Sequence, residues 1–106
     1  MVNKIINEYG DIHYYNEQNQ LHREDGPAEE WSSGSKFWFI NGQKHRLDGP
    51  AEEYHNGDIL WYNNNLLHRI DGPAVDCLDE DKVYYIMGKA LSYEEWLAIK
   101  DYPLLW

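Results

Sequence analysis

Three histidines that recur at a fixed interval are the first residues to consider for chemistry. His22, His45 and His68 stand 23 residues apart, and each opens a copy of the motif His-Arg-x-Asp-Gly-Pro-Ala, hereafter the HRxDGPA motif. Three imidazoles could bind a metal ion or transfer protons. Strands two apart in a β-meander, however, are separated by about 10 Å, too far for successive imidazoles to share an ion ligated at about 2.1 Å. We therefore expect turn residues that bond backbone groups, and we predict no metal site.

The motif also repeats a cation and an anion two residues apart. The pairs are Arg23/Asp25, Arg46/Asp48 and Arg69/Asp71. A guanidinium can bind a carboxylate or a phosphate, so a ligand clamp is one interpretation. Because every copy contains the pair, a role in the fold is the stronger one. Aspartate would hold its turn, and arginine would pack over an aromatic ring or pair with a neighbouring carboxylate.

Carboxylates follow the motif in register: Glu29, Glu30, Glu52 and Glu53, with Asp76 in the third copy. Paired carboxylates can hydrolyse glycosidic bonds, but a regular array singles out no pair. The sequence also lacks a phosphate-binding glycine loop before a helix, a serine elbow and an HExxH helix. We therefore predict no enzyme, no catalytic residue and no cofactor. The acidic strip is expected to be solvated or to bind a partner.

Aromatic residues recur at the same interval. Trp38, Trp61 and Tyr84 are predicted to stack as one ladder with Tyr15 as its first member, while their neighbours point to the other face. Both faces are then partly apolar, so we expect the C-terminal segment to cover one face and a partner to cover the other. The predicted partner-binding residues are Trp38, Trp61, Tyr62, Tyr84, Glu29, Glu30, Glu52 and Glu53.

Short strands and turns must position these residues. In the second copy, 51–54 and 59–62 read as strands, and 48–50 as a turn in which glycine permits positive φ. Asn56-Gly57, like Asn41-Gly42, predicts a type I′ hairpin turn. The fold class predicted is mainly β, a twisted antiparallel β-meander built from repeats, with a short C-terminal capping helix.

The chain is predicted to be one domain, 1–106. It divides into a degenerate half-repeat (1–21), three repeats (22–44, 45–67 and 68–90) and a capping helix with its tail (91–106). Ser92 and Glu95 form a capping-box pattern, and Pro103 should stop the helix near Asp101. We expect this helix to cover the open end of the sheet, because exposed strand edges invite aggregation.

The spacing of Trp38, Gly42 and His45 resembles MORN repeats, which build twisted β-meanders. The chain is most similar to variant MORN-like repeats with HRxDGPA blocks, common in phage and other viral or bacterial proteins. In those proteins a segment like 88–96 often closes the array. The resemblance spans about residues 14–99. It implies a repeat array, and ordinary MORN arrays are linked to membrane lipids and to protein partners.

The formal net charge of -10 disfavours nucleic acid or an anionic membrane as a direct partner. It suits a basic protein partner, or a protein that imitates nucleic acid. A single cysteine excludes an intramolecular disulfide, and the first ten residues lack the apolar core of a signal peptide. We expect a cytoplasmic protein, in the host cytoplasm if it is phage-encoded.

The predicted function is a non-catalytic module that binds a host protein. A specific form of this hypothesis is a phage-type acidic inhibitor of a nucleic-acid-handling or defence protein. Two alternatives stay open. One is a small-molecule (nucleotide-like) binding protein, and the other is a self-assembling structural protein whose protomers join through Leu104, Leu105 and Trp106.

Overall fold

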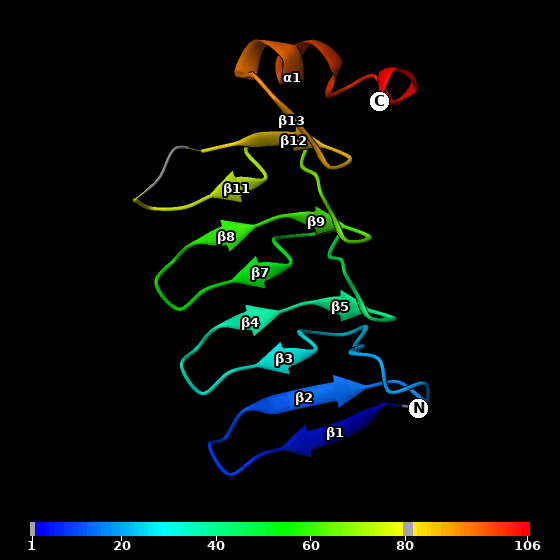
Figure 1. Cartoon of the computed structure of the whole chain (residues 1–106), viewed down its shortest axis with the longest axis vertical. Helices are drawn as coiled ribbons and strands as arrows, with labels where there is room; N and C mark the ends of the chain where they lie inside the picture. The colour runs from blue at the N-terminus through cyan, green and yellow to red at the C-terminus, as the bar shows by residue number, and fades with distance from the viewer. Residues whose placement is uncertain (1, 80–81) are drawn as a thin grey trace.

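The computed structural model describes residues 2–79 and 82–106, and it shows an elongated β-structure with extents of 47 × 31 × 17 Å (Figure 1). Within the described residues, seven strands form one antiparallel sheet in the order β1-β2-β3-β4-β7-β8-β11. They are β1 (Asn3–Ile6), β2 (Ile12–Tyr15), β3 (Glu29–Glu30), β4 (Lys36–Phe37), β7 (Glu52–Glu53), β8 (Ile59–Leu60) and β11 (Val75–Asp76). The predicted mainly-β meander is confirmed.

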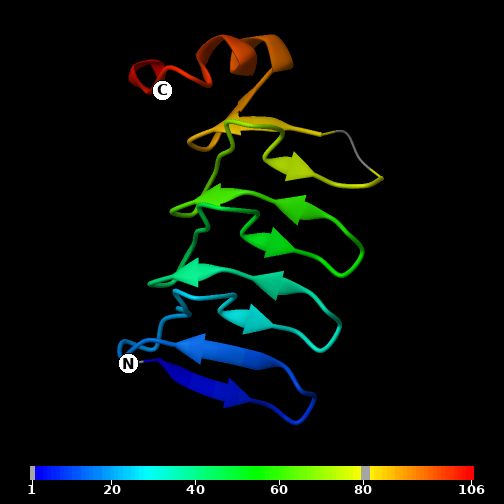
Figure 2. The same ribbon diagram turned by 180° about the vertical axis from the view of Figure 1, so that it is seen from behind.

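Two-stranded hairpins lie beside this sheet along the same edge of the molecule (Figures 1 and 2). They are β5 (Phe39–Ile40) with β6 (Gln43–Lys44), β9 (Tyr62–Asn63) with β10 (Leu66–Leu67), and β12 (Tyr84–Ile86) with β13 (Lys89–Leu91). The strand predicted at 59–62 is therefore divided at Trp61. Its N–H donates to the Ala74 carbonyl at 2.8 Å, and its carbonyl accepts from the His68 N–H at 3.1 Å, so the motif segment bonds the chain where it passes from sheet to hairpin.

The ladder of aromatic residues begins one position earlier than predicted. The Tyr14 N–H donates to the Ala28 carbonyl at 2.8 Å, as the Trp38 N–H does to Ala51. Tyr14 is thus the first member, and the prediction of Tyr15 was wrong. The link to His22 has one extra residue, and the turn at 16–20 absorbs it: the Asn16 N–H donates to the Gln20 carbonyl, so the strand keeps its register.

The hairpin turns fall into two kinds. Asn41 and Gly42 have φ angles of 48° and 80°, which confirms the type I′ turn, since that turn needs two positive φ angles. At Asn56-Gly57 only the glycine is left-handed, with φ 98°, and the Tyr54 N–H donates to the Asp58 carbonyl. The type I′ prediction there was wrong. A three-residue loop needs the left-handed conformation only at its last position.

The glycines of the HRxDGPA motif serve a purpose other than positive φ. They are absent from the residues with left-handed φ. A Cβ atom placed on Gly49 would lie 2.6 Å from Cζ of Arg46, and the corresponding distances are 2.9 Å at Gly26 and 2.8 Å at Gly72. Glycine is therefore required because the guanidinium packs directly on the backbone, which corrects the expectation for 48–50.

The C-terminal helix covers the end of the stack. Helix α1 (Tyr93–Ile99) begins at Ser92, and both hydrogen bonds of the predicted capping box are present. It packs on β12 and β13, with Trp96 buried and its Nε1 donating to the Arg69 carbonyl at 2.8 Å. A 3₁₀ helix, η1 (Pro103–Leu105), follows.

The C-terminal segment thus covers an end of the sheet and not a face, contrary to one expectation. The motif segments cover one face instead. In the tail, Leu104 and Leu105 are exposed, while the Trp106 indole donates to the Ile99 carbonyl at 2.8 Å.

Candidate functional site

The face covered by the motif segments, hereafter the motif face, is saturated by its own contacts. Cζ of Arg46 lies 3.8 Å from the Trp38 ring centroid. Its Nη1 donates to the Pro50 carbonyl at 3.0 Å and to Glu53 at 2.9 Å, and its Nε donates to Asp48 at 3.2 Å. Arg23 over Tyr14 and Arg69 over Trp61 repeat this arrangement, each at 4.1 Å from the ring centroid. The predicted structural role of these arginines is confirmed.

The repeated histidines close the turn of the following hairpin. The N–H groups of Asn41, Asn64 and Met87 donate to Nδ1 of His22, His45 and His68 at 2.9, 3.1 and 3.0 Å. Burial lowers the pKa of His68, which favours the neutral ring that can accept at Nδ1. Across residues 2–79 and 82–106, no group of three or more His, Cys, Asp or Glu side chains is placed to hold a metal ion.

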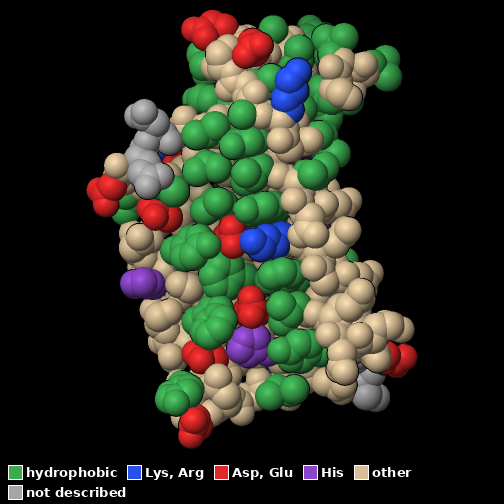
Figure 3. All heavy atoms as spheres, viewed as in Figure 1, with side chains coloured by type: hydrophobic (Ala, Val, Ile, Leu, Met, Phe, Trp, Pro, Cys, Tyr) green, Lys and Arg blue, Asp and Glu red, His purple; other side chains and the backbone are tan. Residues whose placement is uncertain are grey.

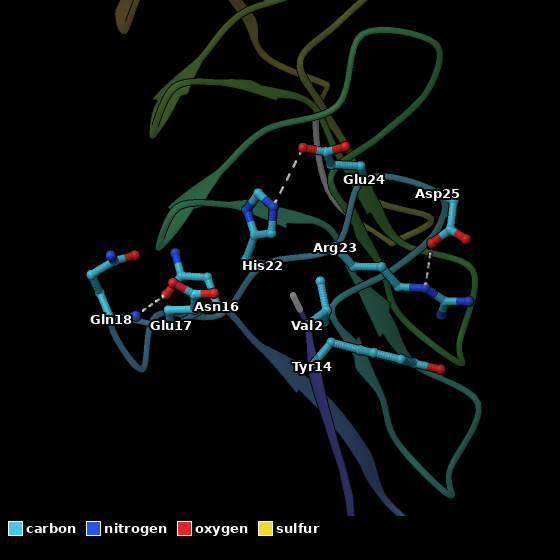
Figure 4. Close-up of a pocket in the computed structure, with 9 residues that line it drawn as sticks. All are labelled: Val2, Tyr14, Asn16, Glu17, Gln18, His22, Arg23, Glu24 and Asp25. Atoms are coloured by element: carbon cyan, nitrogen blue, oxygen red, sulfur yellow. Dashed lines mark hydrogen bonds and ion pairs between the residues drawn. The ribbon is translucent and has the colours of Figure 1, made fainter.

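Hollows on the motif face repeat with the motif. The first, of about 760 Å³, lies at the N-terminal end of the stack (Figure 4). There the side chain of Arg23 points to Asp25 and that of His22 points to Glu24, at 3.0 and 3.6 Å. A similar hollow of about 690 Å³ separates the first two motifs. Because these hollows recur and their polar groups bond one another, they follow from the architecture.

The opposite side of the sheet, hereafter the open face, carries a different row of side chains. The strand register places Glu29 opposite His13 and Phe37, and Glu52 opposite Phe37. Residues opposite one another in antiparallel strands project from the same face. Figure 3 shows apolar side chains along the length of this molecule, with charged side chains set among them.

A shallow groove of about 490 Å³ lies in this row. Its lining includes Glu29, Trp31, Phe37, Phe39, Lys44, Glu52 and Tyr54. The rings of Phe37 and Tyr54 meet edge to face at 5.3 Å, while Trp31 and Tyr54 each stay 38% exposed. Aromatic rings thus remain partly uncovered beside two carboxylates.

Glu52 is the buried carboxylate of the groove, at 5% exposure. Its Oε2 accepts a hydrogen bond from the Tyr54 hydroxyl at 3.2 Å and lies 3.3 Å from Nζ of Lys44. Burial, reinforced by the charge of Glu52, raises the pKa of Tyr62 to about 12. Burial and the same charge also raise the pKa of Tyr54. Both phenols therefore stay neutral near pH 7 and act as hydrogen-bond donors.

Glu29 has a weaker set of partners. Its Oε2 lies 3.1 Å from Nε2 of His13, whose ring meets Trp31 edge to face at 5.2 Å. Burial raises the pKa of Glu29, and the charge of His13 and its hydrogen bond oppose that shift. The carboxylate therefore lies in surroundings that disfavour its negative charge.

The structure divides the predicted partner-binding residues among three places. Trp38, Trp61, Glu30 and Glu53 lie on the motif face, where the rings and both carboxylates contact motif arginines. Tyr84 lies at the capped end, 4.7 Å from the Trp96 ring centroid. Only Glu29, Glu52 and Tyr62 belong to the open face.

Sequence reasoning missed Trp31 and Tyr54. They stand 23 residues apart, and each follows a groove carboxylate by two positions. Strand alternation projects such residues to the same face, so this pattern could have revealed them.

No helix in the described part of the chain has the length and apolar character needed to cross a membrane. Comparison with known proteins gives no match: no family model, no curated protein and no solved structure is significantly similar to the chain. The resemblance to MORN-like repeats stays a prediction.

Proposed function

We propose that the chain is a non-catalytic protein-binding module that docks a basic segment of its partner on the open face. One observation carries this proposal. The groove between Glu29 and Glu52 leaves Trp31 and Tyr54 partly exposed, whereas arginines cover the rings of the motif face. Tryptophan and tyrosine are frequent anchors of protein interfaces.

Charge supports a basic partner. The net charge of -10 attracts basic surfaces and repels nucleic acid and anionic lipid. The motif arginines do not counter this field, because each one is paired with carboxylates of its own copy, as Arg46 is with Asp48 and Glu53. An acidic inhibitor of a nucleic-acid-handling protein is one specific form of the proposal.

We assign no reaction to the groove. Glu52 is held by Tyr54 and Lys44 at 5% exposure, and Glu29 is paired with His13. A catalytic carboxylate needs access to substrate, and a glycosidase needs two such groups on either side of one bond.

Peptide selection tests the proposal before any natural partner is identified. A random-peptide display library is selected on the wild-type protein, and the Kd of each selected peptide is then measured for two variants. Trp31→Ala removes an exposed ring of the open face, and Leu47→Ala removes an exposed side chain of the motif face. Far-UV circular dichroism and thermal unfolding verify that both variants fold.

We expect Trp31→Ala to weaken the selected peptides about tenfold or more, as truncation of an interface anchor does. Leu47→Ala should leave their Kd unchanged. The proposal fails if no peptide is selected, or if the selected peptides respond to Leu47→Ala and not to Trp31→Ala.

A further inference from the structure

We infer that the open-face groove takes a cationic side chain of the partner, lysine or arginine, at Glu29. The inference rests on the proposed function and specifies its ligand. It comes from comparing positions 23 residues apart along the chain, because these positions have the same environment in successive copies.

Lys44 already acts as an internal cation of this kind in the second copy. Its Nζ lies 3.3 Å from Oε2 of Glu52 and 5.0 Å from the ring centroid of Tyr62. A carboxylate beside an aromatic face is a favourable site for an ammonium or guanidinium group, because the charge pair and the ring quadrupole act together.

The first copy keeps these surroundings and lacks the lysine. Glu29, Trp31 and Phe39 stand where the second copy has Glu52, Tyr54 and Tyr62. Leu21 stands where the second copy has Lys44, and it lies opposite Tyr15 in the backbone pairing as Lys44 lies opposite Phe39. Glu29 is therefore set among aromatic rings without the lysine that accompanies its counterpart.

The third copy shows that carboxylate and lysine go together. Val75 replaces the carboxylate, and Leu67 replaces the lysine. Of the three copies, only the first has the carboxylate without the lysine. A partner's cation would complete there the pair that Lys44 completes at Glu52.

The state of Glu29 favours such a guest. Its side chain is 16% exposed, so a cation can reach it from solvent while shedding part of its own hydration. Its present partner is the His13 imidazole at 3.1 Å. Burial raises the pKa of Glu29, so an arriving positive charge relieves an unfavourable carboxylate. The aromatic lining suits the methylene stem of lysine or arginine.

Small probes test the ligand class directly. N-acetylarginine amide and N-acetyllysine amide are titrated into ¹⁵N-labelled protein, and N-acetylcitrulline amide serves as the uncharged isostere of arginine. The readout is the indole N–H resonance of Trp31, assigned with Trp31→Phe. We expect both cations to shift this resonance with a Kd in the millimolar range, and citrulline to bind about tenfold more weakly or not at all.

Three variants locate the site. Glu29→Gln removes the carboxylate, and Leu21→Lys supplies the internal lysine that the first copy lacks. Each should weaken arginine binding about tenfold. Leu21→Met is the uncharged control for Leu21→Lys, and Glu24→Gln makes the Glu29 change on the motif face. Both controls should bind as the wild type does, and the ¹⁵N–¹H spectra establish folding.

Equal binding of arginine and citrulline amides would overturn the inference, as would unchanged binding in Glu29→Gln and Leu21→Lys. Either result leaves the proposed function intact if selected peptides still require Trp31. Absence of any peptide that depends on Trp31 would overturn the proposed function separately.

Discussion

The two faces of the sheet follow different rules. On the motif face, an arginine covers an aromatic ring, a glycine makes room for the guanidinium and a histidine closes the next turn, in every copy. On the open face, the equivalent positions differ from copy to copy, as Glu29, Glu52 and Val75 do. Strict recurrence therefore marks what the fold needs. Variation inside the same framework marks where a function can reside.

The comparison predicts its largest contrast for two tryptophans. Trp38→Ala removes the ring that packs under Arg46 at 3.8 Å, and it should lower the free energy of unfolding by about 3 kcal/mol. Trp31→Ala removes a ring that is 38% exposed, and it should cost less than about 1 kcal/mol. Urea unfolding of both variants measures the difference. Equal losses would mean that the open face is as important for stability as the motif face.

Two glycines sharpen the same comparison at a smaller scale. Gly49→Ala would place Cβ 2.6 Å from Cζ of Arg46 and displace the guanidinium, at a cost of about 2 kcal/mol. Gly10→Ala has open space around the new Cβ but a φ of 84°, so it should cost only about 1 kcal/mol of backbone strain. Thermal unfolding ranks the two. A larger loss for Gly10→Ala would show that backbone conformation, and not arginine packing, dictates the motif glycine.

The smallest effect is expected at Glu29, and it depends on pH. Its folded-state pKa is raised above the ordinary 4.5, so the folded protein holds a proton that the unfolded chain has already lost. Stability from this group is therefore present below pH 4.5 and lost as the pH rises through the folded pKa.

Glu29→Gln removes the charge and should raise the free energy of unfolding at pH 7 by less than about 1 kcal/mol. The difference from the wild type should vanish at pH 4, where both side chains are neutral. Denaturant unfolding at the two pH values checks this, with Glu24→Gln as the control. A loss of stability at pH 7 would mean that the pair with His13 outweighs the cost of burying the carboxylate.

The sequence predicted those features that recur without change. The meander, the roles of His45 and Arg46, and the capping box at Ser92 follow from fixed spacing and local turn or cap chemistry. The distribution of residues between the faces did not follow. Trp38 and Trp61 bond the motif segment where the chain leaves the sheet for a hairpin, and no local propensity encodes that crossing.

Loop lengths account for the remaining errors. One extra residue before His22 suggested a shift of the strand, whereas the turn at 16–20 absorbed it. Trp31 and Tyr54 were missed because each stands in a turn-rich segment, where burial and exposure depend on the tertiary arrangement.

Trp96 has a consequence for the reach of the molecule. Its indole lies over Tyr84, where an arginine lies over the preceding rings, so the array ends by a change of one side chain on the same template. An additional 23-residue unit inserted after Leu67 would meet a familiar surface on both sides. Each such unit adds two strand spacings, about 10 Å. The chain is therefore a rod of adjustable length, and units carrying a carboxylate at the Glu29 position would multiply its docking points at regular intervals, so that weak single contacts combine into avidity.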